Sequence, residues 1–204
     1  SKRVALDEEN GKKLLAEYGI AVPKTVVVPD ANSAAAVVSD LSFPLVGKVV
    51  SPDILHKSDA GGVAVGLSDA DAVTAAISEM AEKPIIKSAN VEGYLIEEMV
   101  PAGQELVIGG VRDPQFGPLI MVGLGGIFVE VLADVAFRVC PINRADAIQM
   151  LDELKGSALL DGVRGQSAVD REAVVDVLLK VGGEGGLLTE LADDIAEADI
   201  NPLI

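Results

Sequence analysis

The chain is poor in the residues that recognise nucleic acids. It has no tryptophan, 3% aromatic residues, one histidine and one cysteine among 204 residues. Its 16 lysines and arginines face 32 aspartates and glutamates, which gives a formal net charge of −16. Scarce cations argue against a nucleic-acid or anionic-membrane partner, and scarce aromatics remove the stacking surfaces that bind single strands. A small anion stays possible, because a few local cations and backbone N–H groups can bind one.

The sequence also lacks the signals of a secreted or membrane protein. No apolar run approaches the roughly 20 residues needed to cross a bilayer, and the opening SKRVALDEEN is unlike a signal peptide. The single cysteine, Cys140, cannot form an internal disulfide, and its apolar neighbours predict a buried strand residue rather than a catalytic thiol. We therefore expect a cytoplasmic protein. Half of its residues are hydrophobic, enough for the core of one domain or two small ones.

The pattern of apolar residues predicts an α+β protein with two lobes. The first part alternates: helices are expected from Asp7 to Gly19, over 31–40 and after a capping box of Ser68 and Asp71, with strands over 25–28, 44–50 and 63–67. After Pro84 a mostly antiparallel sheet is expected, with helices over 145–154 and 170–181 and strands over 85–87, 93–100, 105–111, 119–122, 128–132 and 137–141. The change of pattern near 83–90 predicts the boundary between the lobes. The chain stops at DINPLI without a polar tail, so we expect a piece of a longer protein.

One stretch, FPLVGKVVSPDILHKSDAGGV from Phe43 to Val63, carries the most chemistry. Lys48 stands in an apolar strand, which predicts an anionic partner, and we expect that partner to be a ligand. The alternative is a lysine that reaches solvent from an edge strand. His56 lies in the polar loop that follows, where it could accept a phosphoryl group or transfer a proton, although a lone loop histidine is usually inert.

Acidic and glycine-rich segments supply further candidates. Glu97 and Glu98 are adjacent in a strand, so they point to opposite faces, and one of them must face the inside or a cleft between the lobes. The run GLGGIFVEV, from Gly123 to Val131, could cradle a phosphate and place Glu130 near a magnesium ion, or it could be a plain glycine-rich turn. Asp199 or Asn201 in the final DINPL could add an oxygen ligand, or could simply end a strand. Arg138 and Arg164 could each bind a phosphate through two guanidinium N–H groups, or they could be ordinary surface residues.

The segments SPDILHKSDAGG, EGYLIEEMVPAGQELVIGGVRDPQFGP, GLGGIFVEVLADVAFRVCPI, LKGSALLDGVRG and DINPL together resemble the ATP-grasp domain of the NDP-forming acyl-CoA synthetases, relatives of succinyl-CoA synthetase. The resemblance implies the ATP-grasp fold, with lobes at 1–86 and 87–204 and a mobile histidine loop at 51–60. Nucleotide contacts are implied for Lys48, for a hinge of Glu97, Glu98, Met99 and Val100, and for Glu105, Gly125, Gly126 and Arg138. Glu130 and Asn201 would hold Mg²⁺ beside bound ATP or ADP.

The implied reaction is phosphoryl transfer coupled to acyl-CoA. His56 would relay a phosphoryl group between a phosphohistidine on a separate CoA-binding domain or alpha subunit and ADP, in a hetero- or homo-oligomer. Two departures from the family pattern are visible. Gly47 replaces a bulkier apolar residue before Lys48, which loosens the strand but leaves the cation. The family's chain also continues past DINPL into a strand with a further acidic residue. Without that strand and without the CoA-binding and acyl-processing domains, we expect the isolated piece to be inactive.

Two other functions are compatible with the same residues. One is a non-catalytic regulatory copy attached to a protein acetyltransferase, and the intact Lys48, His56 and Glu130 speak against it. The other is an ATP-grasp ligase that joins a carboxylate to an amine or to bicarbonate, and the SPDILHKSD loop speaks against that. The acyl substrate and the choice between ADP and GDP are not encoded in any residue singled out above.

Overall fold

The computed structural model describes residues 6, 8–54, 56–125, 133–162 and 167–204. The chain forms two compact units. One is Pro23–Val100, and the other combines Ser1–Val22 with Pro101–Ile204. None of the helices in the described ranges is both long and apolar enough to cross a bilayer.

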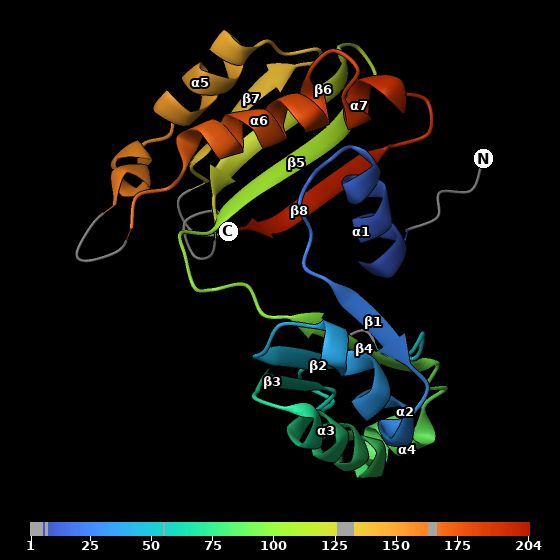
Figure 1. The fold of residues 1–204 in the computed structure, drawn as a ribbon. Coiled ribbons are helices and arrows are strands. Elements are labelled where there is room, and N and C mark those ends of the chain that lie inside the picture. The colour runs from blue at the N-terminus through green and yellow to red at the C-terminus, as the bar shows by residue number, and fades with distance from the viewer. Residues whose placement is uncertain (1–5, 7, 55, 126–132, 163–166) are drawn as a thin grey trace. The chain divides into compact units, whose positions relative to one another are not determined.

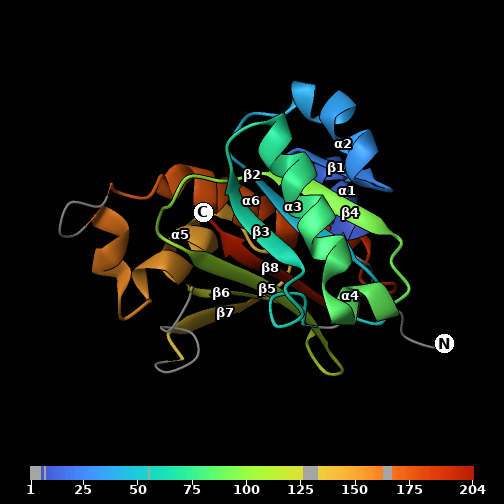
Figure 2. The ribbon, with the colours of Figure 1, turned by 90° about the horizontal axis from the view of Figure 1, so that it is seen from below.

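The unit Pro23–Val100 is a four-stranded antiparallel sheet with helices on one face (Figure 1). The strand order is β1-β4-β2-β3, and the strands are β1 (Thr25–Val28), β2 (Leu45–Val50), β3 (Val63–Leu67) and β4 (Gly93–Glu98). The helices are α2 (Ala31–Val37), the 3-10 helix η1 (Val38–Asp40), α3 (Ala70–Glu82) and α4 (Pro84–Ser88). Helix α3 packs across β2 and β3, as the view in Figure 2 shows.

The buried residues of β2 and β4 show which face of this sheet the helices cover. Leu45, Val49 and Ile96 are buried in one core together with Ile77 and Met80 of α3. The residues that alternate with them in β2 and β4 therefore lie on the face that the helices leave uncovered. This is the face that carries the polar candidates of the sequence.

The second unit has the same arrangement of one sheet and a helical layer. Its antiparallel strands, in the order β7-β6-β5-β8, are β5 (Leu106–Asp113), β6 (Gly117–Leu124), β7 (Val135–Val139) and β8 (Glu197–Leu203). Its helices are α1 (Glu8–Glu17), α5 (Arg144–Asp152), the 3-10 helix η3 (Ser157–Asp161), α6 (Arg171–Gly182) and α7 (Leu187–Glu190). Helices α5 and α6 cover one face of the sheet (Figure 1).

The segment after helix α1 joins this second unit, although the Pro23–Val100 unit follows it in sequence. Ile20 is buried in the same core as Leu106 and Leu178. Lys180 Nζ donates to the carbonyl oxygen of Gly19 at 2.6 Å, and the Tyr18 hydroxyl donates to Glu190 at 3.0 Å. The chain therefore leaves this unit after residue 22 and returns to it at residue 101.

Several expectations about the elements are confirmed and others are wrong. The strands near 25–28, 44–50 and 63–67 and the helices near 145–154 and 170–181 are present. The segment 85–87 is not a strand but part of helix α4, because Pro84 occupies the first turn, where its missing N–H costs nothing. Helix α3 is capped by Asp69, whose carboxylate accepts the Ala72 N–H, and not by Ser68 as expected. Asp7 and the expected strand 128–132 lie outside the described residues.

The boundary between the units differs from the expected one at 86/87. Strand β4 pairs with β1 on one side and β2 on the other, so it is the centre of the first sheet and not the start of the second. The chain crosses between the units at 22/23 and 100/101 instead. Local sequence pattern cannot reveal this, because it does not say which strands pair.

Candidate functional site

Lys48 lies in an interior strand and has an anionic partner within the chain. Its Nζ is 3.4 Å from Oε1 of Glu97, and the side chains are 23% and 10% exposed. Because β2 lies between β4 and β3, a lysine reaching solvent from an edge strand does not describe this position. The partner that we expected to be a ligand is therefore at least partly supplied by Glu97.

The register explains why these two side chains meet. Val46 is opposite Glu97 and Lys48 is opposite Leu95, so Lys48 and Glu97 are diagonal neighbours on the face that the helices leave uncovered. Thr25 of β1 is opposite Glu97 on its other side. A cation, a carboxylate and a hydroxyl side chain thus share this face.

Glu98 points the other way, as strand alternation predicts. Its Oε1 accepts the N–H of Ser42 at 2.7 Å, and this hydrogen bond is the main cause that lowers the pKa of Glu98 below its usual range. Met99 follows, and its N–H donates to the carbonyl oxygen of Pro44 at 3.0 Å. Val100 is the last residue before the chain enters the other unit. Glu97 is the buried member of the pair, although it lies on the face that the helices leave uncovered.

His56 is exposed and lies between two buried anchors of its loop, Ile54 and Ala60. The Ala60 N–H donates to the carbonyl oxygen of His56 at 3.2 Å, and Asp53 accepts the N–H of Asn90 at 2.7 Å. The first of these hydrogen bonds closes a turn within the loop, and the second links the loop to the segment after α4. The predicted mobility of 51–60 stays a prediction.

The start of the glycine-rich run needs glycine for a close backbone approach. The N–H of Gly125 donates to the carbonyl oxygen of Glu105 at 2.7 Å. A Cβ on Gly125 would lie 2.7 Å from the Cβ of Glu105, closer than side chains tolerate. Gly125 and Glu105, both candidate nucleotide contacts, are therefore adjacent. Gly126, Glu130 and Arg164 lie outside the described residues.

Strand β8 carries several side chains whose oxygen atoms could bind a metal ion. Ala198 and Ile200 pack against the core, so the alternate residues Glu197 and Asp199 lie on the opposite face. Asn201 is exposed and lies where the pairing of β8 with β5 shifts register. Burial, followed by the charge of Glu197, raises the pKa of Asp199 above its usual value. Asp199 lines a hollow in this face whose other walls include Gly109, Met121 and Phe137. Within the described ranges, no three His, Cys, Asp or Glu side chains converge as a metal site.

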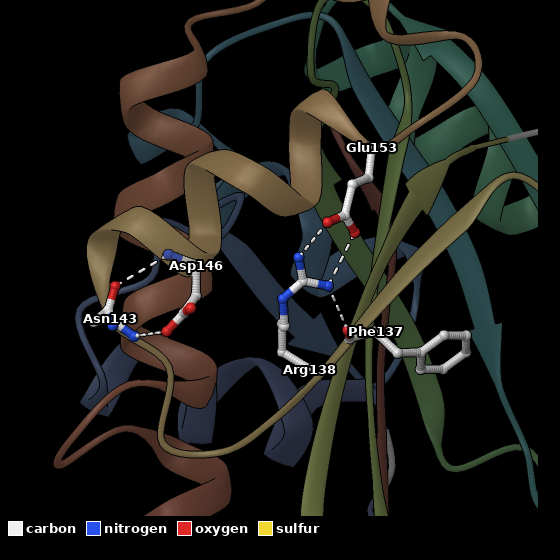
Figure 3. A network of polar contacts seen from close by, with 5 residues as sticks. All are labelled: Phe137, Arg138, Asn143, Asp146 and Glu153. Atoms are coloured by element: carbon white, nitrogen blue, oxygen red, sulfur yellow. Dashed lines mark hydrogen bonds and ion pairs between the residues drawn. The ribbon is translucent and has the colours of Figure 1, made fainter.

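Arg138 lies on the other face of that sheet. Its guanidinium forms two hydrogen bonds to the carboxylate of Glu153, the residue that follows α5, with N···O distances of 2.5 and 2.9 Å, and it also donates to the carbonyl oxygen of Phe137 at 2.8 Å (Figure 3). The hydrogen bonds to Glu153 raise the pKa of Arg138. Because Arg138 alternates with Phe137, which lines the hollow, the structure does not bring it together with Asp199. Its proposed phosphate contact would require exchange of Glu153 for a ligand.

One buried carboxylate was not singled out from the sequence. Asp134 is 4% exposed, and its two oxygens accept the N–H groups of Lys155 and Gly156 at 2.7 and 2.8 Å. It fixes the turn between α5 and η3 to the segment that precedes β7. Its position just after the glycine-rich run could have drawn attention to it. Its partners could not be predicted from local sequence pattern, because they lie 21 and 22 residues further along the chain.

The whole chain, residues 1–204, matches the family model described as the ATP-grasp domain. The chain belongs to the ATP-grasp family. The expected α+β ATP-grasp fold is thereby confirmed, and the solved structures agree. Acetyl-coenzyme A synthetase 1 of Ca. Korarchaeum cryptofilum, in complex with coenzyme A and Ca-AMPCP, superposes with a TM-score of 0.85 at 41% identity over 96% of this chain and 85% of that one.

Two of the similar proteins are ADP-forming acetate–CoA ligases. The beta subunit of acetate–CoA ligase I from Pyrococcus furiosus is 42% identical over 203 residues, which cover 97% of this chain and 84% of the subunit. Acetate–CoA ligase I of Archaeoglobus fulgidus is 39% identical over 194 residues, covering 95% of this chain and 28% of that protein. This ATP-grasp chain thus spans most of a separate subunit in one relative and about a quarter of a longer polypeptide in the other.

Proposed function

We propose that this chain is the nucleotide-binding part of an ADP-forming acyl-CoA synthetase. The observation that carries the proposal is Lys48, a cation on the uncovered face of an interior strand, in a chain about 40% identical to the beta subunits of such enzymes. A partly exposed lysine there can contact a phosphate as well as Glu97, because its ammonium group has three donors. The names of the relatives favour this function over a regulatory copy and over an amine or bicarbonate ligase.

The nucleotide contacts that we propose are those that the resemblance implies. Lys48 would contact the phosphates, the segment Glu97–Val100 would hold adenine and ribose, and Gly125 with Glu105 would offer backbone groups. Arg138 could join only by leaving Glu153. Asn201, with Glu130, would hold Mg²⁺, which offsets phosphate charge when bound. The side-chain chemistry suits this ion, since Asn201 and Glu130 both carry oxygen atoms, the ligands that Mg²⁺ prefers.

His56 would carry the phosphoryl group. An imidazole nitrogen of His56 attacks the phosphorus of a phosphohistidine on the CoA-binding domain or alpha subunit, and the P–N bond of that phosphohistidine breaks. A terminal oxygen of ADP then attacks the same phosphorus, which frees His56 and forms ATP. The coupled reaction converts acyl-CoA, phosphate and ADP into acid, CoA and ATP. The exposure of His56 supports such a role, because its partner must come from another domain.

Phosphoryl transfer tests this proposal. The chain is combined with its CoA-binding partner, acetyl-CoA, phosphate and ADP with Mg²⁺, and ATP is measured. We expect wild type to form ATP, His56→Ala to form none, and the neighbouring Ser58→Ala to behave as wild type. Equal ATP from His56→Ala would refute the relay. Mg-ADP binding without any ATP from wild type would favour the regulatory copy.

A further inference from the structure

Asp134 is a buried carboxylate to which the proposed function gives no role. Its two oxygens accept the N–H groups of Lys155 and Gly156 at 2.7 and 2.8 Å, so it holds the turn between α5 and η3. Hydrogen bonds to a charged acceptor are strong, and a buried carboxylate is costly unless its oxygens are used in this way. The turn is therefore fixed to the residue that precedes β7.

The same turn also contacts the end of β6. Gly156 lies so close to Leu124, the last residue of that strand, that a Cβ on Gly156 would clash with Leu124 Cδ1. The side chain of Leu124 is fully buried. Because β6 and β7 are paired up to Gly123 and Val135, this one turn holds the end of β6 and the start of β7 together.

The backbone of Ala133 indicates that the position of Asp134 is imposed by its surroundings. Ala133 has a φ of 45°, in the left-handed region that residues with a Cβ rarely adopt. Such a conformation persists only where neighbouring contacts determine it. The two hydrogen bonds of the adjacent Asp134 are contacts of that kind, and they set the direction in which the chain enters β7.

Leu124 carries this constraint to a proposed nucleotide contact. The next residue, Gly125, is buried and donates its N–H to the carbonyl oxygen of Glu105 at 2.7 Å. Leu124 itself is paired in the sheet with Leu106, the residue that follows Glu105. A shift of the Leu124 side chain would therefore move the backbone of Gly125 relative to Glu105.

We propose that Asp134 is a positioning residue of the nucleotide site, which acts through the turn at Gly156 on the backbone of Gly125. The carboxylate holds the turn, the turn holds the side chain of Leu124, and Leu124 fixes the glycine that follows it. The inference rests on the proposed nucleotide site, and Asp134 itself makes no contact with the nucleotide. Loss of its charge weakens the first of these contacts and lowers the affinity for nucleotide.

Two measurements on the whole chain test Asp134→Asn, which keeps the size of the side chain and loses the charge. Without nucleotide, hydrogen exchange of the Gly125 amide should become about fivefold faster relative to the Ile120 amide in the middle of β6. In calorimetry, the Kd of Mg-ADP should rise by about fivefold, the effect of one weakened hydrogen bond, at an unchanged stoichiometry. A loss of folded protein alone would lower the stoichiometry and leave the Kd unchanged.

Asp113→Asn is the matched control. The Asp113 carboxylate also accepts two backbone N–H groups, those of Gln115 and Phe116 at 2.7 and 2.9 Å. It does so in the turn at the opposite end of β5 and β6. This variant should change neither the exchange of the Gly125 amide nor the Kd of Mg-ADP.

A second pair of variants leaves Asp134 in place and decides the case in which Asp134→Asn does not fold. Gly156→Ala places a methyl group against Leu124 and should raise the Kd of Mg-ADP. Leu124→Val removes the obstructing Cδ1, so the double variant should bind Mg-ADP more tightly than Gly156→Ala alone. General damage to the core would instead make the double variant the weaker binder.

The proposal is overturned if folded Asp134→Asn keeps the wild-type exchange of the Gly125 amide or the wild-type Kd. It is also overturned if Leu124→Val further weakens the binding of Gly156→Ala. Absence of Mg-ADP binding by wild type would refute the proposed function, and the exchange of the Gly125 amide would still decide whether Asp134 positions this backbone.

Discussion

Gly47 and Gly93 lie in paired strands of one sheet, yet only one of them needs to be glycine. A Cβ on Gly47 would meet Met80 Cε at 3.5 Å and Leu67 Cδ1 at 3.6 Å, which is ordinary packing distance. Gly93 has a φ of 154°, and its Cβ would lie 2.7 Å from the carbonyl oxygen of Val28. The departure from family pattern at Gly47 therefore leaves room for one methyl group next to Lys48.

We expect Gly47→Ala to raise the free energy of unfolding by about 0.4–1 kcal/mol, because alanine restricts the unfolded chain and fits the folded one. Gly93→Ala should lower it by about 1–3 kcal/mol, because its backbone conformation and the nearby carbonyl both oppose a side chain. Urea unfolding followed by circular dichroism measures both. A destabilised Gly47→Ala would show that the strand around Lys48 is packed more tightly than its contacts indicate.

At the scale of elements, helix α3 shows how a cap decides where a helix begins. The Asp69 carboxylate accepts the Ala72 N–H at 2.8 Å and the Ser68 hydroxyl at 3.1 Å. These hydrogen bonds, the backbone one first, lower the pKa of Asp69. In the folded chain Asp69 thus loses its proton at lower pH than in the unfolded chain. Its contribution to stability is present above the usual value of about 3.9 and is lost as pH falls through the lowered pKa.

Asp69→Ala should therefore lower the melting temperature at pH 7, and the deficit should shrink as pH falls below about 3.9. Ser68→Ala removes only one donor to the same carboxylate and should cost less. Thermal unfolding of both variants at pH 7 and below about pH 3.9 distinguishes capping by Asp69 from capping by Ser68 with Asp71. A larger loss in Ser68→Ala would restore the capping box of Ser68 and Asp71 that the sequence suggested.

Elements with strong periodicity are predictable from the sequence, and pairings are not. The spacing of Val73, Ile77 and Met80 predicts α3, because only a helix places them on one face. The β-branched and apolar run of β2 predicts a strand for the same kind of reason. The short segment 85–87 is compatible with a helix or a strand, and Pro84 in the first turn favours the helix. The sequence alone shows that Lys48 is a cation in an apolar strand. It does not show that Glu97 is its partner, because the two residues are 49 positions apart and meet only through the register of their strands.

At the scale of the whole molecule, the described residues of the two units form separate cores, and each unit contains a four-stranded sheet. We expect the segment Pro23–Val100, produced alone, to unfold cooperatively in urea, because it retains β4 between β1 and β2. The segment 1–86 lacks β4 and should not fold cooperatively. Circular dichroism and proton chemical-shift dispersion measure the difference. Cooperative unfolding of 1–86 would contradict the division of the chain at 22/23 and 100/101.

The account as a whole depends on nucleotide binding through Lys48. Calorimetric titration of Mg-ADP into the chain and into Lys48→Met measures this most directly. We predict saturable one-to-one binding by wild type and a dissociation constant larger by about tenfold or more in Lys48→Met, the loss of one charge-assisted contact worth about 1.5–3 kcal/mol. Equal affinity of the two proteins, with Lys48→Met folded as judged by circular dichroism, or no binding by wild type, would contradict the account.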